Sequence, residues 1–446
     1  MEALAQPHKS LFWSAPNDFA ADFVIEDPLA FDYLGQQVGY WLFGGLTTRT
    51  SRAQYIAVVL YGLWLVDEAV RGLDVDDEHR KELFERWERF WALAIHEYRG
   101  GAFERSDDDA IRGQRGVSRA WRPSGDSLPL DYKLIGRQTE LGGLGAYMSA
   151  LRHEAASLVF PGTLRPTALA MDIIEAFWAE PGSGMKTSSY EEYAARSLDL
   201  DRKTVPRKHG AVTLARVGEL SRLTSLVALK RTDQQSRLWR ALFERASDDT
   251  LRFAELVRVA TRAGITDARL IVERGLAGDY GSWTERQRDK LVIALAFGDV
   301  QRELMSAFNR AYAVAFAHGW KVDAAKAADE ALGGAVGAGL RRACAVVLDA
   351  PLAAAFQRLP MHGKEFIDLV ATLRDASPVT ALEAIVLYHA VIHRQRRHAT
   401  PWFRLEEGRL LIDVGAYGAR SDAEGTFPSL KLNVVRSLLR DLGRLS

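Results

Sequence analysis

The sequence of 446 residues contains a single cysteine, Cys344. One thiol excludes an intramolecular disulfide framework and any zinc module built from several cysteines. The apolar helical pattern around Cys344 predicts a core position for its side chain. Long hydrophobic runs are also lacking. The best candidate for a membrane span, Ala53–Val66, has 14 uncharged residues, whereas a helix needs about 20 to cross a bilayer. We therefore expect Ala53–Val66 to be a buried core helix and expect no membrane partner.

Targeting signals are absent as well. Residues 1–14 contain neither the apolar stretch of a secretory signal nor an arginine-rich transit peptide. The chain has 46 arginines but only 12 lysines, a usage that is commonest in GC-rich bacteria. Together these features favour a soluble, cytoplasmic, bacterial protein.

Apolar residues recur three and four positions apart along most of the chain. Within Asp77–Tyr98, Leu83, Trp87, Phe90 and Trp91 form one apolar stripe among charged residues, which indicates an amphipathic helix. The same spacing predicts helices over Pro166–Ala179, Val212–Leu229, Gln234–Arg245, Thr250–Ala263, Thr266–Arg274, Trp283–Phe297, Asp299–His318, Asp323–Leu332, Gly339–Leu348, Gly363–Arg374, Pro378–Arg397 and Ser429–Leu442.

Strand patterns are nearly absent before the C-terminus. There, two extended runs, Trp402–Leu405 and Arg409–Val414, flank a turn at Gly408 and predict a β-hairpin. The sequence thus predicts an all-α, multi-helical fold with two or more helical domains and a small C-terminal β-hairpin. We expect an acidic helical domain, a linker-rich middle region, a central helical domain and a C-terminal helix–hairpin–helix, over residues 1–110, 111–210, 211–376 and 377–446 respectively. Loops are expected over Arg99–Asp131 and Glu180–Gly210, which are rich in glycine and proline. Both exceed the usual loop length, so each is expected to be a domain linker, a partly disordered segment or a functional loop.

A net charge of one sign is lacking, because 58 basic residues balance 58 acidic residues. This neutrality is a cancellation between regions. Residues 1–110 have 20 acids and 10 bases, a net charge of −10, whereas residues 186–245 have 7 acids and 13 bases, a net charge of +6. A binding partner interacts with the charge of the surface it contacts and not with the total charge of the chain. The net charge of zero therefore does not exclude binding to a polyanion.

The first candidate binding site is a basic cluster of Arg202, Lys203, Arg207 and Lys208, on a loop that enters a predicted helix. Flexible cations beside a helix N-terminus suit nucleic-acid phosphates. The alternative is a solvated linker, or a segment that pairs with the acidic N-terminal third.

A second basic cluster, Arg394, Arg396 and Arg397, ends a predicted helix just before two aromatic residues. Nucleic-acid bases stack on such rings, but cations at a helix C-terminus also simply complement the helix dipole. Arg49 and Arg52 lie instead at a helix N-terminus, where the dipole disfavours cations. We therefore expect these two arginines to meet carboxylates or phosphates.

Motifs of specific chemistry are lacking. The segment Gly182–Thr187 lacks the first glycine and the preceding strand of a phosphate-binding loop. His389 and His393 share a helix face, yet a zinc site needs a third ligand. Arg89 and His96 enclose six residues, a loose pattern of helical ribonucleases of the HEPN type, although Phe90 stands where those enzymes usually have a polar residue. We expect no catalytic residue, no metal and no cofactor.

The segregated charge and the missing motifs favour a non-catalytic helical subunit of a larger cytoplasmic assembly. We expect it to bind a protein partner, and consider DNA or RNA as a second partner through the two basic clusters. By analogy, a bacterial nucleic-acid-handling or phage-defence system is a natural setting. The alternatives are a helical ribonuclease that uses Arg89 and His96, or a scaffold that binds only proteins.

Overall fold

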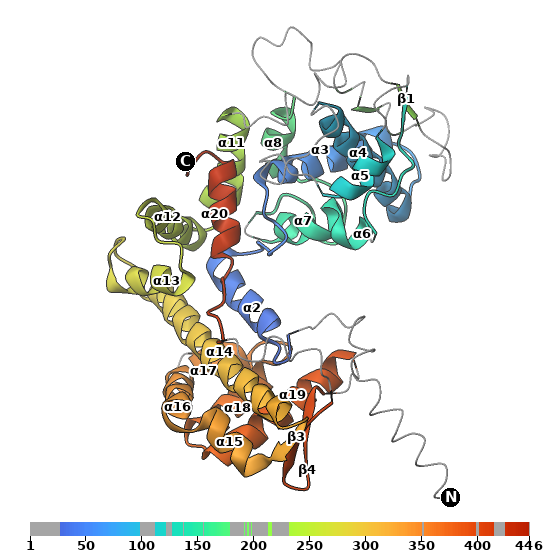
Figure 1. Ribbon diagram of the computed structural model, residues 1–446. Helices are drawn as coiled ribbons and strands as arrows, with labels where there is room; N and C mark the ends of the chain where they lie inside the picture. Colours follow the sequence, from blue (N-terminus) through green and yellow to red (C-terminus); the bar gives the residue numbers. More distant parts are fainter. Residues whose placement is uncertain are drawn as a thin grey trace, which may run out of the picture. The chain divides into compact units, whose positions relative to one another are not determined.

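The structure is a computed structural model that describes residues 27–98, 112–121, 127–136, 138–154, 156–178, 191, 194–195, 198, 213–215, 232–349, 352–397, 401–413 and 424–445. Helices dominate these residues (Figure 1), and the predicted all-α, multi-helical fold with a small C-terminal β-element is confirmed. The chain divides into two compact units. Unit 1 contains residues 1–41 and 266–430, and unit 2 contains residues 42–265 and 431–446. Each unit therefore combines segments that the expected sequence ranges keep apart.

Unit 1 is built around α14 (Glu285–Ala317), a helix of 33 residues. A capping box closes its N-terminus, because Thr284 and Gln287 each accept a hydrogen bond from the other's backbone N–H. The predicted core position of Cys344 is confirmed, and burial raises the pKa of its thiol to about 12. Helix α2 (Phe31–Phe43) belongs to this unit up to Trp41. The other helices of unit 1 are α13 (Ala268–Ala277), α15 (Ala324–Leu332), α16 (Gly334–Leu348), α17 (Leu352–Gln357), α18 (Gly363–Arg374) and α19 (Pro378–Arg397).

The continuity of α14 corrects the sequence-based prediction of two helices that meet at Gly298. This glycine lies inside the helix and is buried. A Cβ atom built on it would overlap the ring of Phe427. Gly298 therefore permits close approach of another segment and does not end the helix.

A three-stranded antiparallel sheet completes unit 1, in the order β3–β5–β4. The predicted hairpin forms from β4 (Phe403–Glu406) and β5 (Arg409–Ile412). Its two turn residues, Glu407 and Gly408, both have positive φ, as expected for the turn type that matches strand twist. The prediction missed β3 (Lys321–Asp323), which pairs with β5. A strand of three residues has too little alternation to be detected in a sequence.

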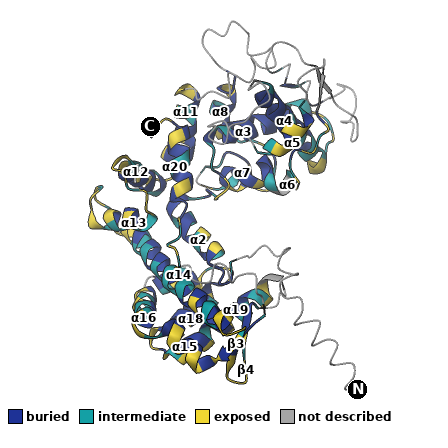
Figure 2. Cartoon of the chain, in the orientation of Figure 1, coloured by how far each residue is buried: buried dark blue, intermediate teal, exposed yellow. Residues whose placement is uncertain are grey.

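Unit 2 contains α3 (Ala53–Ala69), in which 12 of 17 residues are buried (Figure 2). The predicted buried core helix is confirmed. Stacked and edge-on rings of Tyr61, Trp87, Phe177 and Trp178 form the aromatic core beside it. The other elements are α4 (Asp77–Tyr98), α5 (Gln114–Ala120), β1 (Ser127–Pro129), α6 (Gln138–Leu141), α7 (Gly143–Arg152), η2 (Ala168–Ala170), α8 (Met171–Glu175), β2 (Thr213–Ala215), α11 (Thr232–Trp239), η3 (Arg240–Glu244), α12 (Asp248–Arg262) and α20 (Leu432–Asp441).

Two predictions for unit 2 are wrong in part. The start of the expected helix Val212–Leu229 contains a strand, β2, which pairs with β1, and the rest of that segment lies outside the described residues. The expected loop Arg99–Asp131 contains both β1 and α5. Short elements whose partners are distant in sequence leave little periodicity for a sequence pattern to detect.

The N-terminus of α3 is capped from the other end of the chain. Arg52 occupies the N-cap position and makes no side-chain capping hydrogen bond. The carboxylate of buried Asp441, in α20, accepts hydrogen bonds from Ala53 N at 2.9 Å and from Arg52 Nε at 3.0 Å. The expectation that Arg52 meets a carboxylate is confirmed.

Among the described residues, no single helix has the length and apolar character needed to cross a membrane. The consecutive helices α15 and α16 meet that test only as a pair, and they are bent by 76° at their junction.

Candidate polyanion-binding site

The first predicted basic cluster, Arg202, Lys203, Arg207 and Lys208, lies outside the described residues, as does the glycine-rich segment 182–187. The structure therefore gives no surroundings for these side chains. Their role in binding stays a prediction.

The second predicted cluster lies in the last turn of α19. The side chain of Arg394 is exposed and donates from Nε to the carbonyl oxygen of Ala390 at 3.2 Å. This contact is local to the helix, and the role of Arg394 in binding stays a prediction. Arg396 and Arg397 continue the same turn, and the side chains of these two arginines lie outside the described part.

The proposed ribonuclease pair lies on α4, but its members have different surroundings. His96 is 1% exposed, packs edge-on against Trp121 at a ring distance of 5.3 Å, and has its pKa lowered by burial. Arg89 forms an ion pair with Glu85 at 3.0 Å. A general acid must reach its substrate, so this geometry gives the ribonuclease alternative no support.

The histidine pair of α19 is used structurally. His389 Nδ1 donates to the carbonyl oxygen of Pro28 at 2.9 Å, and Nε2 accepts from Trp402 N at 2.9 Å. Both ring nitrogens therefore connect segments of unit 1. Burial, followed by the neighbouring His393, lowers the pKa of His389 to about 3. Across the described residues, no group of three or more His, Cys, Asp or Glu side chains could hold a metal ion.

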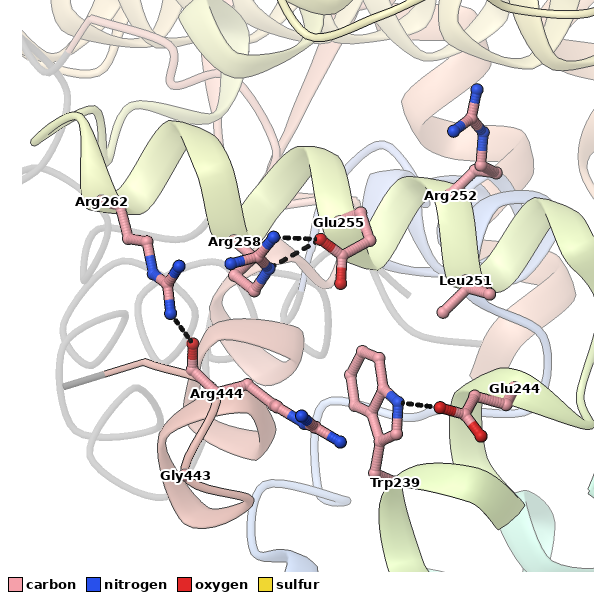
Figure 3. A pocket seen from close by; sticks show the side chains of 9 residues that line it. All are labelled: Trp239, Glu244, Leu251, Arg252, Glu255, Arg258, Arg262, Gly443 and Arg444. Atoms are coloured by element: carbon pink, nitrogen blue, oxygen red, sulfur yellow. Dashed lines mark hydrogen bonds and ion pairs between the residues drawn. The ribbon is translucent and has the colours of Figure 1, made fainter. Parts of the chain in front are cut away.

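Sequence reasoning missed a pocket of about 550 Å³ in unit 2. It lies between α12, the turn η3 and the residues that follow α20. We call it the arginine pocket, because four arginines and two glutamates contribute to its lining. Its lining includes Trp239, Glu244, Glu255, Arg258, Arg262 and Arg444 (Figure 3).

One wall of the arginine pocket is a face of α12. Phe253, Val257 and other apolar residues of this amphipathic helix are buried on the opposite side, which leaves Glu255, Arg258 and Arg262 along the pocket. These positions are three and four apart, and so they share a helix face. Arg258 pairs with Glu255 at 2.6 Å.

Trp239 and Glu244 form a second wall. Residues 240–244 make one turn of π-helix, a local widening that often occurs at functional sites. Because this turn holds more residues than an α-helical one, the side chain five positions after Trp239 comes round to its indole ring. The Trp239 Nε1–H donates to Glu244 Oε1 at 2.6 Å, and Phe243 packs against the indole at a ring distance of 4.8 Å.

The chain after α20 supplies Arg444. Gly443 has a φ of +66° and directly follows the end of the helix. Arg444 N then donates to Leu439 O at 2.8 Å, and Arg262 donates to Arg444 O at 3.1 Å. This backbone support holds the Arg444 guanidinium over the Trp239 ring, 4.9 Å from its centroid, in a cation–π arrangement.

The pocket could have been suspected only in part from the sequence. Arg258 and Arg262 show a four-residue spacing on a predicted helix, but Trp239 and Arg444 are 205 positions apart (444 minus 239). No local pattern joins them.

A second group of buried polar residues lies around Glu88 of α4, which is 2% exposed. Its carboxylate accepts hydrogen bonds from Tyr55 Oη at 2.5 Å, from Gly143 N at 2.7 Å and from Gln138 Nε2 at 3.3 Å. Burial raises the pKa of Glu88, although the hydrogen bonds from these three donors each lower it. They satisfy a carboxylate that caps α7 and joins it to α3 and α4, which is a structural task.

Lys431 is a third buried polar group, 2% exposed, at the N-cap of α20. Burial lowers the pKa of its ammonium group to about 6. It lies close enough to His153 for its charge to contribute to the lowered pKa of that imidazole, after the larger effect of burial.

Comparison of the chain with protein-family models, with curated proteins and with solved structures finds no match.

Proposed function

We propose that the protein binds nucleic acid through the arginine pocket of unit 2, as a non-catalytic subunit of a larger assembly. The observation that supports binding is the excess of arginine over carboxylate in one concave site, together with an arginine held against an aromatic ring. The assembly and its protein partner rest on the sequence alone.

Arginine suits this role because its planar guanidinium donates two parallel hydrogen bonds to phosphate oxygens. Arg262 and Arg444 are both exposed, so a phosphate reaches them without unfolding the helix. Phosphate contacts supply most of the affinity of sequence-independent binding and make it depend on salt. Such binding does not require net positive charge over the whole chain.

A titration of fluorescein-labelled single-stranded RNA and DNA with the full-length protein, at several salt concentrations, tests the proposal. The double variant Arg262→Gln/Arg444→Gln should bind about tenfold more weakly and should lower the salt slope by roughly 1.4, because about 0.7 is lost for each phosphate contact on a single strand. The matched control, Arg310→Gln/Arg342→Gln, removes two exposed arginines of unit 1 and should bind as the unchanged protein does. Equal affinity and slope for the pocket variant and the unchanged protein would reject the arginine pocket.

The same titration examines the clusters proposed from the sequence. Charge reversal to Glu at Arg202, Lys203, Arg207 and Lys208 abolishes salt-sensitive binding if the loop carries the contact. A denaturing gel of the recovered RNA separates binding from turnover. Intact RNA supports the proposal, whereas cleavage that is lost on His96→Ala would favour the ribonuclease alternative. No retention of either nucleic acid at low salt would favour the protein-binding scaffold.

A further inference from the structure

The arginine pocket has two chemically different ends. In Figure 3 the guanidinium groups of Arg258, Arg262 and Arg444 lie on one side of the Trp239 ring, and the Glu244 carboxylate lies on the other. A ligand that is anionic throughout would be repelled at Glu244. The pocket therefore suits a ligand with a negative group at one end and hydrogen-bond donors at the other. A nucleotide has both, because its phosphate is anionic while its sugar hydroxyl and most bases provide donors.

The charge of the arginine end indicates which kind of phosphate fits. Three arginines and the Glu255 carboxylate give this end a formal charge of +2. A phosphodiester inside a strand carries one negative charge, whereas a terminal phosphomonoester carries about −1.5 to −2 at neutral pH. The terminal group is therefore the better electrostatic match. Arg252, which also contributes to the lining, points away from the other three guanidinium groups in Figure 3 and is not counted here.

The placement of Arg444 favours binding of a phosphate in one orientation. Its guanidinium lies over the Trp239 ring, and the backbone bond from Arg262 fixes the chain that carries it. A guanidinium held in one plane loses less freedom when it binds two phosphate oxygens at once. A pocket of about 550 Å³ is also of the size that takes one small molecule.

From these three observations we infer that the arginine pocket recognises a nucleotide through its phosphomonoester, with the phosphate at Arg258, Arg262 and Arg444 and the base or sugar donors at Glu244. The same chemistry occurs at a phosphorylated end of a nucleic-acid strand and in a free mononucleotide. This inference rests on the proposed function, since it specifies which part of a nucleic acid enters the pocket.

The test compares labelled 12-nucleotide RNA and DNA strands that carry a 5′-phosphate, a 3′-phosphate or hydroxyl groups at both ends. One phosphorylated form should bind at least tenfold more tightly than the hydroxyl form. Arg444→Gln and Arg262→Gln should each bring that ratio close to one, and the control Arg342→Gln should preserve it. Because the second pKa of a phosphomonoester is about 6, the preference should also weaken between pH 7.5 and pH 5.5.

Competition by AMP distinguishes the two sources. Competition at a concentration similar to that of the phosphorylated strand assigns the pocket to free nucleotides, and much weaker competition assigns it to strand ends. Glu244→Gln keeps an oxygen acceptor for Trp239 and removes one charge. It should weaken competition by AMP several-fold, because the acceptor for the base or sugar donors loses its charge, and should not weaken competition by inorganic phosphate, which gains from the loss of a nearby negative charge.

Three results would overturn the inference: equal binding of phosphorylated and hydroxyl strands, a preference that persists in both arginine variants, or inorganic phosphate or a phosphoserine peptide that competes as well as AMP. If phosphorylated and hydroxyl strands bind equally but their binding still depends on the pocket arginines, the inference fails and the proposed function stands. Absence of strand binding at low salt rejects the proposed function itself.

Discussion

Two groups of arginines differ in their carboxylate partners. In unit 1, Arg269 and Arg302 lie among Asp299, Glu273 and Glu303, with ion pairs of 2.6 to 3.6 Å. In the arginine pocket of unit 2, arginines outnumber glutamates four to two. The first group has more acids than bases and contributes to the packing of α13 on α14. The second keeps an excess of positive charge in a concave site. The two groups therefore differ in their local balance of charge, which the number of arginines alone does not reveal.

The largest expected effect concerns an arginine of unit 2 that pairs with a buried carboxylate. Asp441 is 4% exposed and both pairs with Arg52 and caps α3. Asp441→Ala removes the carboxylate that accepts from Arg52 Nε and from Ala53 N, so the free energy of unfolding should fall by about 3–5 kcal/mol. Urea denaturation followed by circular dichroism measures the loss.

A matched control for this change is Asp375→Ala, which removes an exposed partner of Arg374. Surface pairs of this kind contribute at most about 1 kcal/mol. If the two variants lose equal stability, the distinction between buried and exposed pairs does not hold in this protein.

The next effect concerns a buried lysine, Lys431. Burial lowers the pKa of Lys431 from 10.5 to about 6, so between these values the unfolded chain binds a proton that the folded chain does not. The free energy of unfolding should therefore rise with pH across this range. Lys431→Met should stabilise the protein, on the order of 2 kcal/mol at pH 7.

Urea denaturation at pH 7 and pH 9 checks this sign. The gain from Lys431→Met should be larger at pH 7 than at pH 9, and Lys364→Met, at an exposed lysine of α18, should show no gain at either. A gain that grows with pH would contradict the assigned burial cost.

The sequence predicts local elements of the structure better than it predicts contacts between distant segments. The buried helix at Ala53 and the hairpin before Asp413 follow from local apolar patterns, and the structure confirms both. The cap of α3 by Asp441 and the placement of Arg444 on Trp239 do not, because each joins residues more than 200 positions apart. Such contacts depend on how helices pack, which periodicity does not encode. The regional charge of the sequence points to loops and to a helix end, whereas the arginine pocket depends on residues contributed by separate helices.

A smaller effect on stability is expected from the paired arginines of unit 1. Arg269→Gln removes ion pairs with Glu273 and Asp299 on partly exposed surfaces. The free energy of unfolding should fall by about 0.5–1 kcal/mol, and RNA binding should be unchanged. Thermal denaturation and the titration described above measure the two quantities on the same sample.

The converse change in the arginine pocket has the smallest expected effect on folding. Arg262 is exposed at the end of α12, where its side chain meets only the carbonyl oxygen of Arg444 among the contacts that the described residues show. Arg262→Gln retains a donor for that carbonyl, so the free energy of unfolding should change by less than about 0.5 kcal/mol. The lost positive charge should nevertheless weaken RNA binding by roughly threefold or more at low salt, and less at high salt, since exposed charges are screened. If Arg262→Gln and Arg269→Gln change stability and binding in the same proportion, then the excess of arginine in the pocket has no function that the paired arginines lack.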